Sequence, residues 1–68
     1  MNYWLDRGFT VKGTGPGSKF WIVGQNGKHA VCEMDFSGRL EKVSGWMPAE
    51  NMAREFAQRL DHDELVNA

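Results

Sequence analysis

An Asn26-Gly27 pair stands between two runs of aromatic and β-branched residues, and this dipeptide limits the fold more than any other feature of the chain. Both central positions of a type I′ turn need a positive φ, which Asn and Gly tolerate, so the pair predicts a two-residue β-hairpin. Such a turn fixes the register of its strands, and the register sorts the side chains onto two faces. It places Trp21 opposite Cys32 and Val23 opposite Ala30.

Both faces of this hairpin are expected to be rich in apolar side chains. We assign the wholly apolar face to the core beneath a helix; it carries Trp21, Val23, Ala30, Cys32, Met34 and Phe36. In a sheet with one solvated side the opposite face would be polar. Here it carries Phe20, Ile22, Gly24, His29, Val31, Glu33 and Asp35. One helix cannot cover both faces, so the second is either covered by the segment around Trp4 or left as an open apolar patch.

The rest of the pattern predicts one α+β domain over residues 1–68, a hairpin meander of three or four antiparallel strands packed against one C-terminal amphipathic helix. Alternation and turn signals place the strands at about 5–12, 19–25, 28–36 and 39–44. From Pro48 the apolar spacing becomes helical, and a helix is expected over about 48–61. Residues 62–68 are expected to form an acidic tail. The apolar stripe of the helix consists of Ala49, Met52, Ala53, Phe56, Ala57 and Leu60.

The size of the chain makes an added source of stability necessary. A domain of 68 residues buries only about 60% of the surface that its unfolded chain exposes. Cys32 is the one cysteine, so no internal disulfide forms, and a lone thiol favours a reducing compartment. We expect a cytoplasmic protein with no signal peptide and no membrane segment. Oligomerisation or partner binding is the remaining stabilising interaction.

Residues suited to catalysis or metal binding do not gather in the sequence. The glycine-rich segment 13–19 is read as a flexible loop, because a phosphate loop needs Gly-Lys-Ser/Thr opening a helix. His62 supplies one imidazole where zinc needs three or four N/S ligands. Cys32 and His29 have opposite parity on one strand and therefore point to opposite sides of the sheet. We predict no enzyme, no metal site and no cofactor.

The net charge of −1 conceals a division along the chain. Residues 1–31 carry four bases against one acid (+3), and residues 32–68 carry four bases against eight acids (−4). A helix that docks against phosphate should be basic, whereas this one is acidic. The acidic helix is a candidate for a secondary, phosphate-mimicking contact to a basic partner.

Nucleic-acid binding is one alternative, and an architectural resemblance supports it. In Phe20–Leu60, Trp-bearing strands lead into a helix that starts at Pro48. This arrangement resembles the plant DNA-binding domains of the ethylene-response type, the arm-binding domains of tyrosine recombinases and the later part of double-stranded-RNA-binding domains. The resemblance implies a nucleic-acid interface on the sheet, with bases stacked on Phe20 and His29. The backbone contacts would be Arg7, Lys12, Lys19 and Lys28. The chain departs from those families in carrying Glu50 at the helix start and none of their runs of bases.

Size, missing chemistry, the charge division and the second apolar face favour a protein–protein interaction module. We expect a regulator or inhibitor that acts by occluding a surface, as many small phage- or mobile-element-type proteins do. The expected partner-binding residues are Phe20, Ile22, His29, Val31 and Glu33. A homodimer that associates through the same face, and that Val31→Lys would disrupt, is the other alternative. No membrane and no small-molecule cofactor is expected as a partner.

Overall fold

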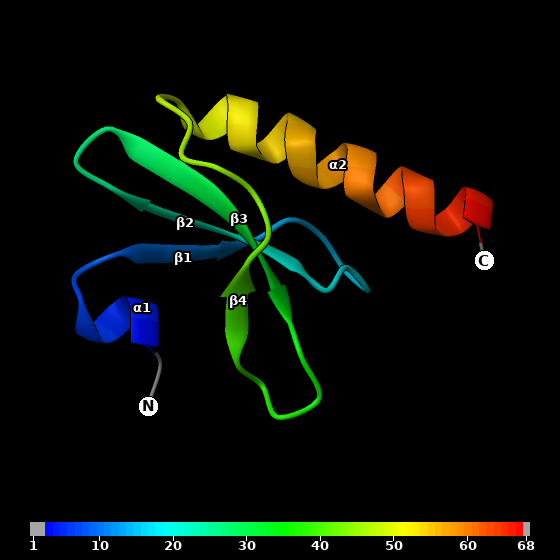
Figure 1. Ribbon diagram of the computed structural model, residues 1–68, viewed down its shortest axis with the longest axis horizontal. Helices are drawn as coiled ribbons and strands as arrows, with labels where there is room; N and C mark the ends of the chain where they lie inside the picture. Colours follow the sequence, from blue (N-terminus) through cyan, green and yellow to red (C-terminus); the bar gives the residue numbers. More distant parts are fainter. Residues whose placement is uncertain (1–2, 68) are drawn as a thin grey trace.

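The computed structural model describes residues 3–67 and contains a four-stranded antiparallel sheet with a long C-terminal helix against it (Figure 1). Strands that follow one another in the chain are neighbours in the sheet, whose order is β1-β2-β3-β4. The predicted α+β meander is therefore confirmed. The elements are α1 (Tyr3–Asp6), β1 (Thr10–Gly13), β2 (Phe20–Gln25), β3 (Lys28–Met34), β4 (Leu40–Lys42) and α2 (Glu50–Asn67).

The central hairpin has the predicted turn and register. Asn26 and Gly27 adopt φ values of 49° and 77°, as a type I′ turn requires at its two central positions. Trp21 lies opposite Cys32, and Val23 lies opposite Ala30. The two sets of side chains expected from the register therefore do occupy opposite faces.

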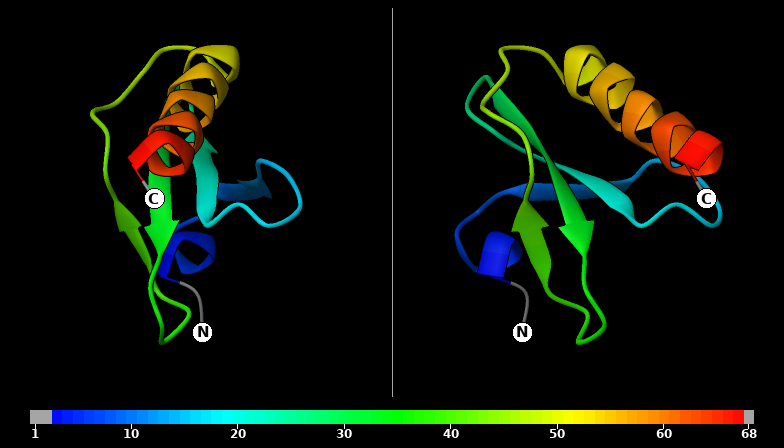
Figure 2. Two further views of the ribbon diagram at one scale, coloured as in Figure 1. Left: turned by 90° about the vertical axis from the view of Figure 1, so that its right-hand side faces the viewer. Right: turned by 45° about the vertical axis from the view of Figure 1, so that its right-hand side comes forward.

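The assignment of these faces to helix and partner, however, is reversed. Figure 2 shows α2 lying along one side of the central hairpin. This is the face that was expected to be open, and on it Phe20, Ile22 and Val31 form one buried cluster with Ala53 and Ala57. Alternation shows which residues share a face but does not show which face the helix will choose. The volumes explain the choice, because an alanine stripe allows the helix to approach bulky strand side chains closely.

The other face is covered by bulky aromatic side chains from outside the sheet. Trp4 and Phe9 are buried against Val23, Ala30 and Cys32. The indole Nε1 of Trp4 donates a hydrogen bond of 3.0 Å to the Leu40 carbonyl oxygen in β4. The segment around Trp4 thus covers one face of the sheet, as expected in one of the two alternatives. The face that it covers, however, is the one that was assigned to the helix.

Several expected boundaries, and the place of one expected core residue, differ from the structure. Residues 3–6 form the short helix α1, so the first strand is only Thr10–Gly13 and does not begin at residue 5. α2 runs to Asn67, and residues 62–67 are helical rather than a tail. Phe36, expected in the core, is fully exposed in the turn after β3. The helix continues because its acidic last turns have partners: Asp61 accepts a 2.9 Å hydrogen bond from Ser18, and Glu64 forms an ion pair with Lys19.

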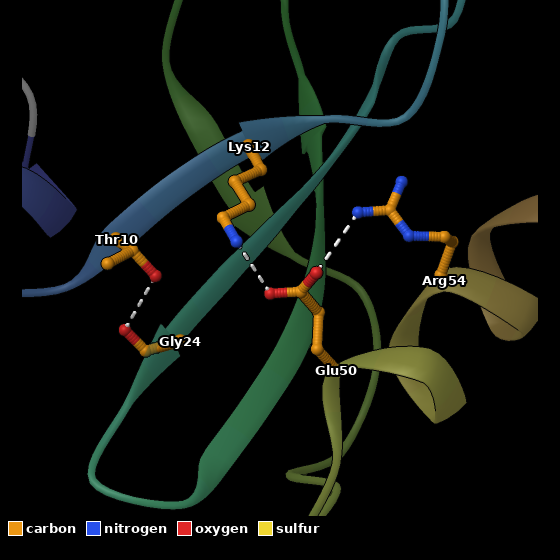
Figure 3. A network of polar contacts seen from close by, with 5 residues as sticks. All are labelled: Thr10, Lys12, Gly24, Glu50 and Arg54. Atoms are coloured by element: carbon orange, nitrogen blue, oxygen red, sulfur yellow. Dashed lines mark hydrogen bonds and ion pairs between the residues drawn. The ribbon is translucent and has the colours of Figure 1, made fainter.

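Two bases from the first half of the chain, Lys12 and Lys19, form ion pairs with acids from the second half. Lys12 on the edge strand β1 lies 3.0 Å from the Glu50 carboxylate, which Arg54 also contacts at 3.1 Å (Figure 3). Lys19, in the loop after β1, lies 2.8 Å from Glu33 and reaches Glu64 as well. Each exposed pair contributes little to stability, because water screens the two charges. Together they hold α2 across β1 and the glycine-rich loop. Within residues 3–67, no helix is long and apolar enough to cross a membrane.

We predict that enlarging the helix at its closest approach destabilises the protein. Ala57 is fully buried against the sheet, so Ala57→Leu should lower the free energy of unfolding by about 1–3 kcal/mol in chemical denaturation. Gln58→Leu, at the exposed next position, is the matched control and should change it by less than about 0.5 kcal/mol. Equal stability of the two variants would contradict the placement of α2.

Candidate partner-binding surface

The predicted contact residues do not form an accessible surface. Phe20, Ile22 and Val31 are only 4%, 2% and 0% exposed beneath α2, so the prediction that they bind a partner, or a second copy, is wrong. Glu33 is half-buried and paired with Lys19. His29 is half-buried, and its Nδ1 atom has no hydrogen-bond partner among residues 3–67.

The four bases proposed as nucleic-acid contacts are spread over two sides of the molecule. Lys12 and Lys19 lie on the α2 side, where acids neutralise them. Arg7 lies beside α1, its guanidinium 3.6 Å from the ring centre of Tyr3. Lys28 extends from the start of β3 on the opposite face from α2. The structure therefore does not bring the four into one continuous track.

An exposed indole, which the sequence analysis did not single out as a contact, lies on the face opposite α2. Trp46 is 43% exposed and belongs to the connection between β4 and α2. Its ring stacks on Phe9 at a centroid distance of 5.8 Å and meets Trp4 edge-on at 6.2 Å. The next residue, Met47, exchanges two 2.7 Å backbone hydrogen bonds with His29. The backing rings and the bonded backbone fix the indole while leaving part of it in solvent.

The ammonium groups of two lysines lie over the ring of this indole and complete the site. The Nζ atoms of Lys28 and Lys42 lie 4.7 and 5.0 Å from the ring centre of Trp46. Both lysines share the face of Cys32, because Lys42 pairs with Cys32 across β3 and β4, and Lys28 precedes Cys32 by an even number of residues. Neither makes an ion pair with an acid of residues 3–67. We call Trp46, Lys28 and Lys42 the Trp46 surface.

This surface combines a flat apolar area with two positive charges. Ammonium groups near an indole are attracted to its ring while remaining hydrated, which keeps them available to a further anion. The hairpin register is sufficient to place Lys28 on the face opposite α2. The position of Trp46 depends in addition on the path of residues 43–47 along β3. Val43 N, for example, donates a 2.9 Å hydrogen bond to the Val31 carbonyl oxygen.

A groove of about 700 Å³ lies between α1 and the strand β4. Tyr3 and Trp4 line one side, and residues 37–42 line the other. At its end is the turn that carries Phe36. The Asp35 carboxylate closes this turn by accepting hydrogen bonds from the Ser37 backbone (2.9 Å), the Ser37 hydroxyl (2.7 Å) and the Arg39 backbone (3.0 Å).

The chemistry of the remaining polar groups is limited. Burial raises the pKa of the Cys32 thiol to about 11, despite the opposing effect of the Lys42 charge, so the thiol stays protonated at neutral pH. No three His, Cys, Asp or Glu side chains of residues 3–67 lie where they would hold a metal ion together.

No family model matches the chain, and neither a curated protein nor a solved structure matches it. The resemblance of residues 20–60 to nucleic-acid-binding domains is therefore one of architecture, a sheet with one helix. A functional proposal has to start from the Trp46 surface and the groove.

We predict that Cys32 is chemically inert in the folded protein. Because the thiolate is the reactive form and the side chain is fully buried, a disulfide reagent should modify it only at the rate at which the protein opens. Addition of denaturant should restore the reactivity of an ordinary thiol. Equally fast modification of native and denatured protein would show that Cys32 is accessible.

We predict that Asp35 makes stability depend on acid pH. The Ser37 hydroxyl, followed by the Arg39 backbone N–H, lowers the pKa of Asp35 below its ordinary value. The unfolded state then binds the proton more readily, so this stabilisation is present above the ordinary aspartate pKa of about 4 and is lost as the pH falls through the lower, folded value. Asp35→Asn should be less stable than the wild type at neutral pH, by a margin that shrinks in acid.

Ser37→Ala, which removes the first of these donors, should have a smaller effect of the same kind. Denaturation curves at several pH values measure both variants. A pH-independent difference between Asp35→Asn and the wild type would refute the role of the carboxylate.

Proposed function

We propose that this protein is a non-catalytic protein–protein interaction module that binds an acidic segment of another protein through the Trp46 surface. The observation that carries the proposal is the exposed indole of Trp46 with the Lys28 and Lys42 ammonium groups within 5.0 Å of its ring centre. Tryptophan is enriched among the residues that contribute most to protein interfaces. The two ammonium groups over the ring would pair with carboxylates of the acidic segment, and the exposed part of the indole would contact one of its apolar side chains.

An acidic protein fits the charge distribution better than a nucleic acid does. Nucleic-acid affinity rises with the number of phosphates that bases neutralise, and two of the four bases considered for that role already contact acids. The chain carries a net charge of −1, and α2 adds an acidic surface on the other side of the sheet. A long polyanion would be repelled there, whereas a short acidic segment would meet only the Trp46 surface.

Binding at this surface would regulate a partner by covering its acidic segment. The site is rigid, because Phe9 and Trp4 support the indole, so little conformational entropy is lost on binding. A small regulator or inhibitor of the phage or mobile-element type, working in the cytoplasm, fits a domain of this size whose single thiol is buried and reduced.

An NMR titration tests the proposal with two probes, an acidic peptide that contains one phenylalanine and an oligothymidylate. The peptide should shift the indole N–H resonance of Trp46 more than those of Trp4 and Trp21. Trp46→Ala should weaken peptide binding by at least about tenfold, which corresponds to a loss of about 1.4 kcal/mol or more and is typical of a residue that dominates an interface.

A matched pair of variants separates specific contact from net charge. Lys28→Gln/Lys42→Gln should weaken peptide binding, and Lys12→Gln/Lys19→Gln, which removes the same charge on the α2 side, should leave it nearly unchanged. Equal losses in both double variants would refute a site at Trp46. Steeply salt-dependent oligothymidylate binding without peptide binding would replace the proposal with a nucleic-acid interface.

A further inference from the structure

The β3–β4 turn presents one aromatic side chain entirely to solvent. Phe36 exposes 111% of its reference surface. This exposure is unfavourable, because the free energy falls when a phenyl ring is transferred out of water. The turn around it is fixed by the three hydrogen bonds to Asp35 and by a 2.9 Å bond from Asp35 N to the Arg39 carbonyl oxygen. Gly38, at φ +84°, adopts the left-handed conformation that closes the turn. The ring is therefore held out by an ordered backbone.

The groove beside this turn has the size and lining to receive such a ring. Its volume of about 700 Å³ is within the range of about 300–1,000 Å³ in which protein pockets enclose ring-bearing ligands. Trp4 and Leu40, both buried side chains, provide apolar lining, and Tyr3 adds an exposed aromatic ring. Phe36 directly precedes Ser37 in the groove wall.

We propose that the occupant of this groove is Phe36 of a second copy of the chain, in a two-fold symmetric dimer. In such a dimer the same patch is used twice, so the inserted ring and the groove that receives it must lie side by side on one surface. Phe36 and the groove meet this condition, because they are adjacent in the chain. Each groove is completed only by the phenyl ring of the partner copy.

The charges at the groove favour self-association over an acidic or a basic partner. Asp35 and Glu41 stand against Arg39 and Lys42, so the patch has no net charge and two copies do not repel each other. A standard interface takes about 800 Å² from each partner, about a sixth of the 4722 Å² that one chain exposes. Trp46 and Lys28 do not line the groove, but Lys42 does, so the dimer interface would share this one lysine with the Trp46 surface.

Sedimentation velocity over a wide range of protein concentrations tests this proposal. The wild type should approach twice the monomer mass as the concentration rises. Phe36→Asp should stay monomeric at the same concentrations, and its circular dichroism and thermal midpoint should match those of dilute wild type, because the side chain makes no buried contact. Leu65→Asp, which places the same charge at a 79% exposed position on α2, is the control and should dimerise as the wild type does.

A second readout locates the interface. The indole N–H resonance of Trp4 should shift with concentration in the wild type and remain constant in Phe36→Asp. A wild type that is monomeric throughout, or a Phe36→Asp variant that dimerises normally, would overturn the proposal. Acidic-peptide binding to Phe36→Asp reports on the Trp46 surface separately, so the two proposals can fail independently.

Discussion

The fold depends on complementary volumes across a sheet that is apolar on both faces. On one face large strand residues, such as Phe20 and Ile22, meet the small residues Ala53 and Ala57 of α2. On the other, small strand residues, such as Ala30 and Cys32, lie beneath the large ring of Trp4. Close packing favours this pairing of large with small side chains. If α2 and the Trp4 segment exchanged faces, alanine would lie against alanine and the indole against the phenyl ring. The position of the Trp46 surface depends on this packing, because Trp46 contacts the rings of Trp4 and Phe9, which cover Ala30 and Cys32.

The electrostatic character of the surface follows from how the helix is attached. Acids at both ends of α2 bind the edge strand and the glycine-rich loop, as Glu50 does with Lys12 and Asp61 with Ser18. The Lys12 ammonium group and, after it, the Arg54 guanidinium lower the pKa of Glu50. These ion pairs use charges that would otherwise face a partner. Lys28 and Lys42, on the opposite face, form no ion pair with an acid in the described part of the chain, residues 3–67. The molecule therefore has an internally compensated side and a side with unpaired positive charge.

The sequence was sufficient to predict the architecture and the hairpin register, because both depend on local signals such as Asn26-Gly27 and the change of apolar period at Pro48. The face that the helix covers was assigned wrongly, because alternation separates apolar from polar positions and takes no account of side-chain volume. α1 is a single turn without a periodic pattern of its own and owes its place to Trp4. The Trp46 surface needed the path of residues 43–47, which depends on backbone bonds to β3. Only Lys28 could be assigned to the correct face from register alone.

The two covers contact the hairpin from opposite sides and belong to separate buried clusters. Both join segments distant in sequence: Trp4 bonds to Leu40, 36 positions away, and Ser18 bonds to Asp61, 43 positions away. The hairpin itself is local, so it is suited to act as the folding nucleus on which each cover docks in its own slow step. Because the two clusters share no buried residue, we expect the aromatic cover to open without the helix leaving the sheet.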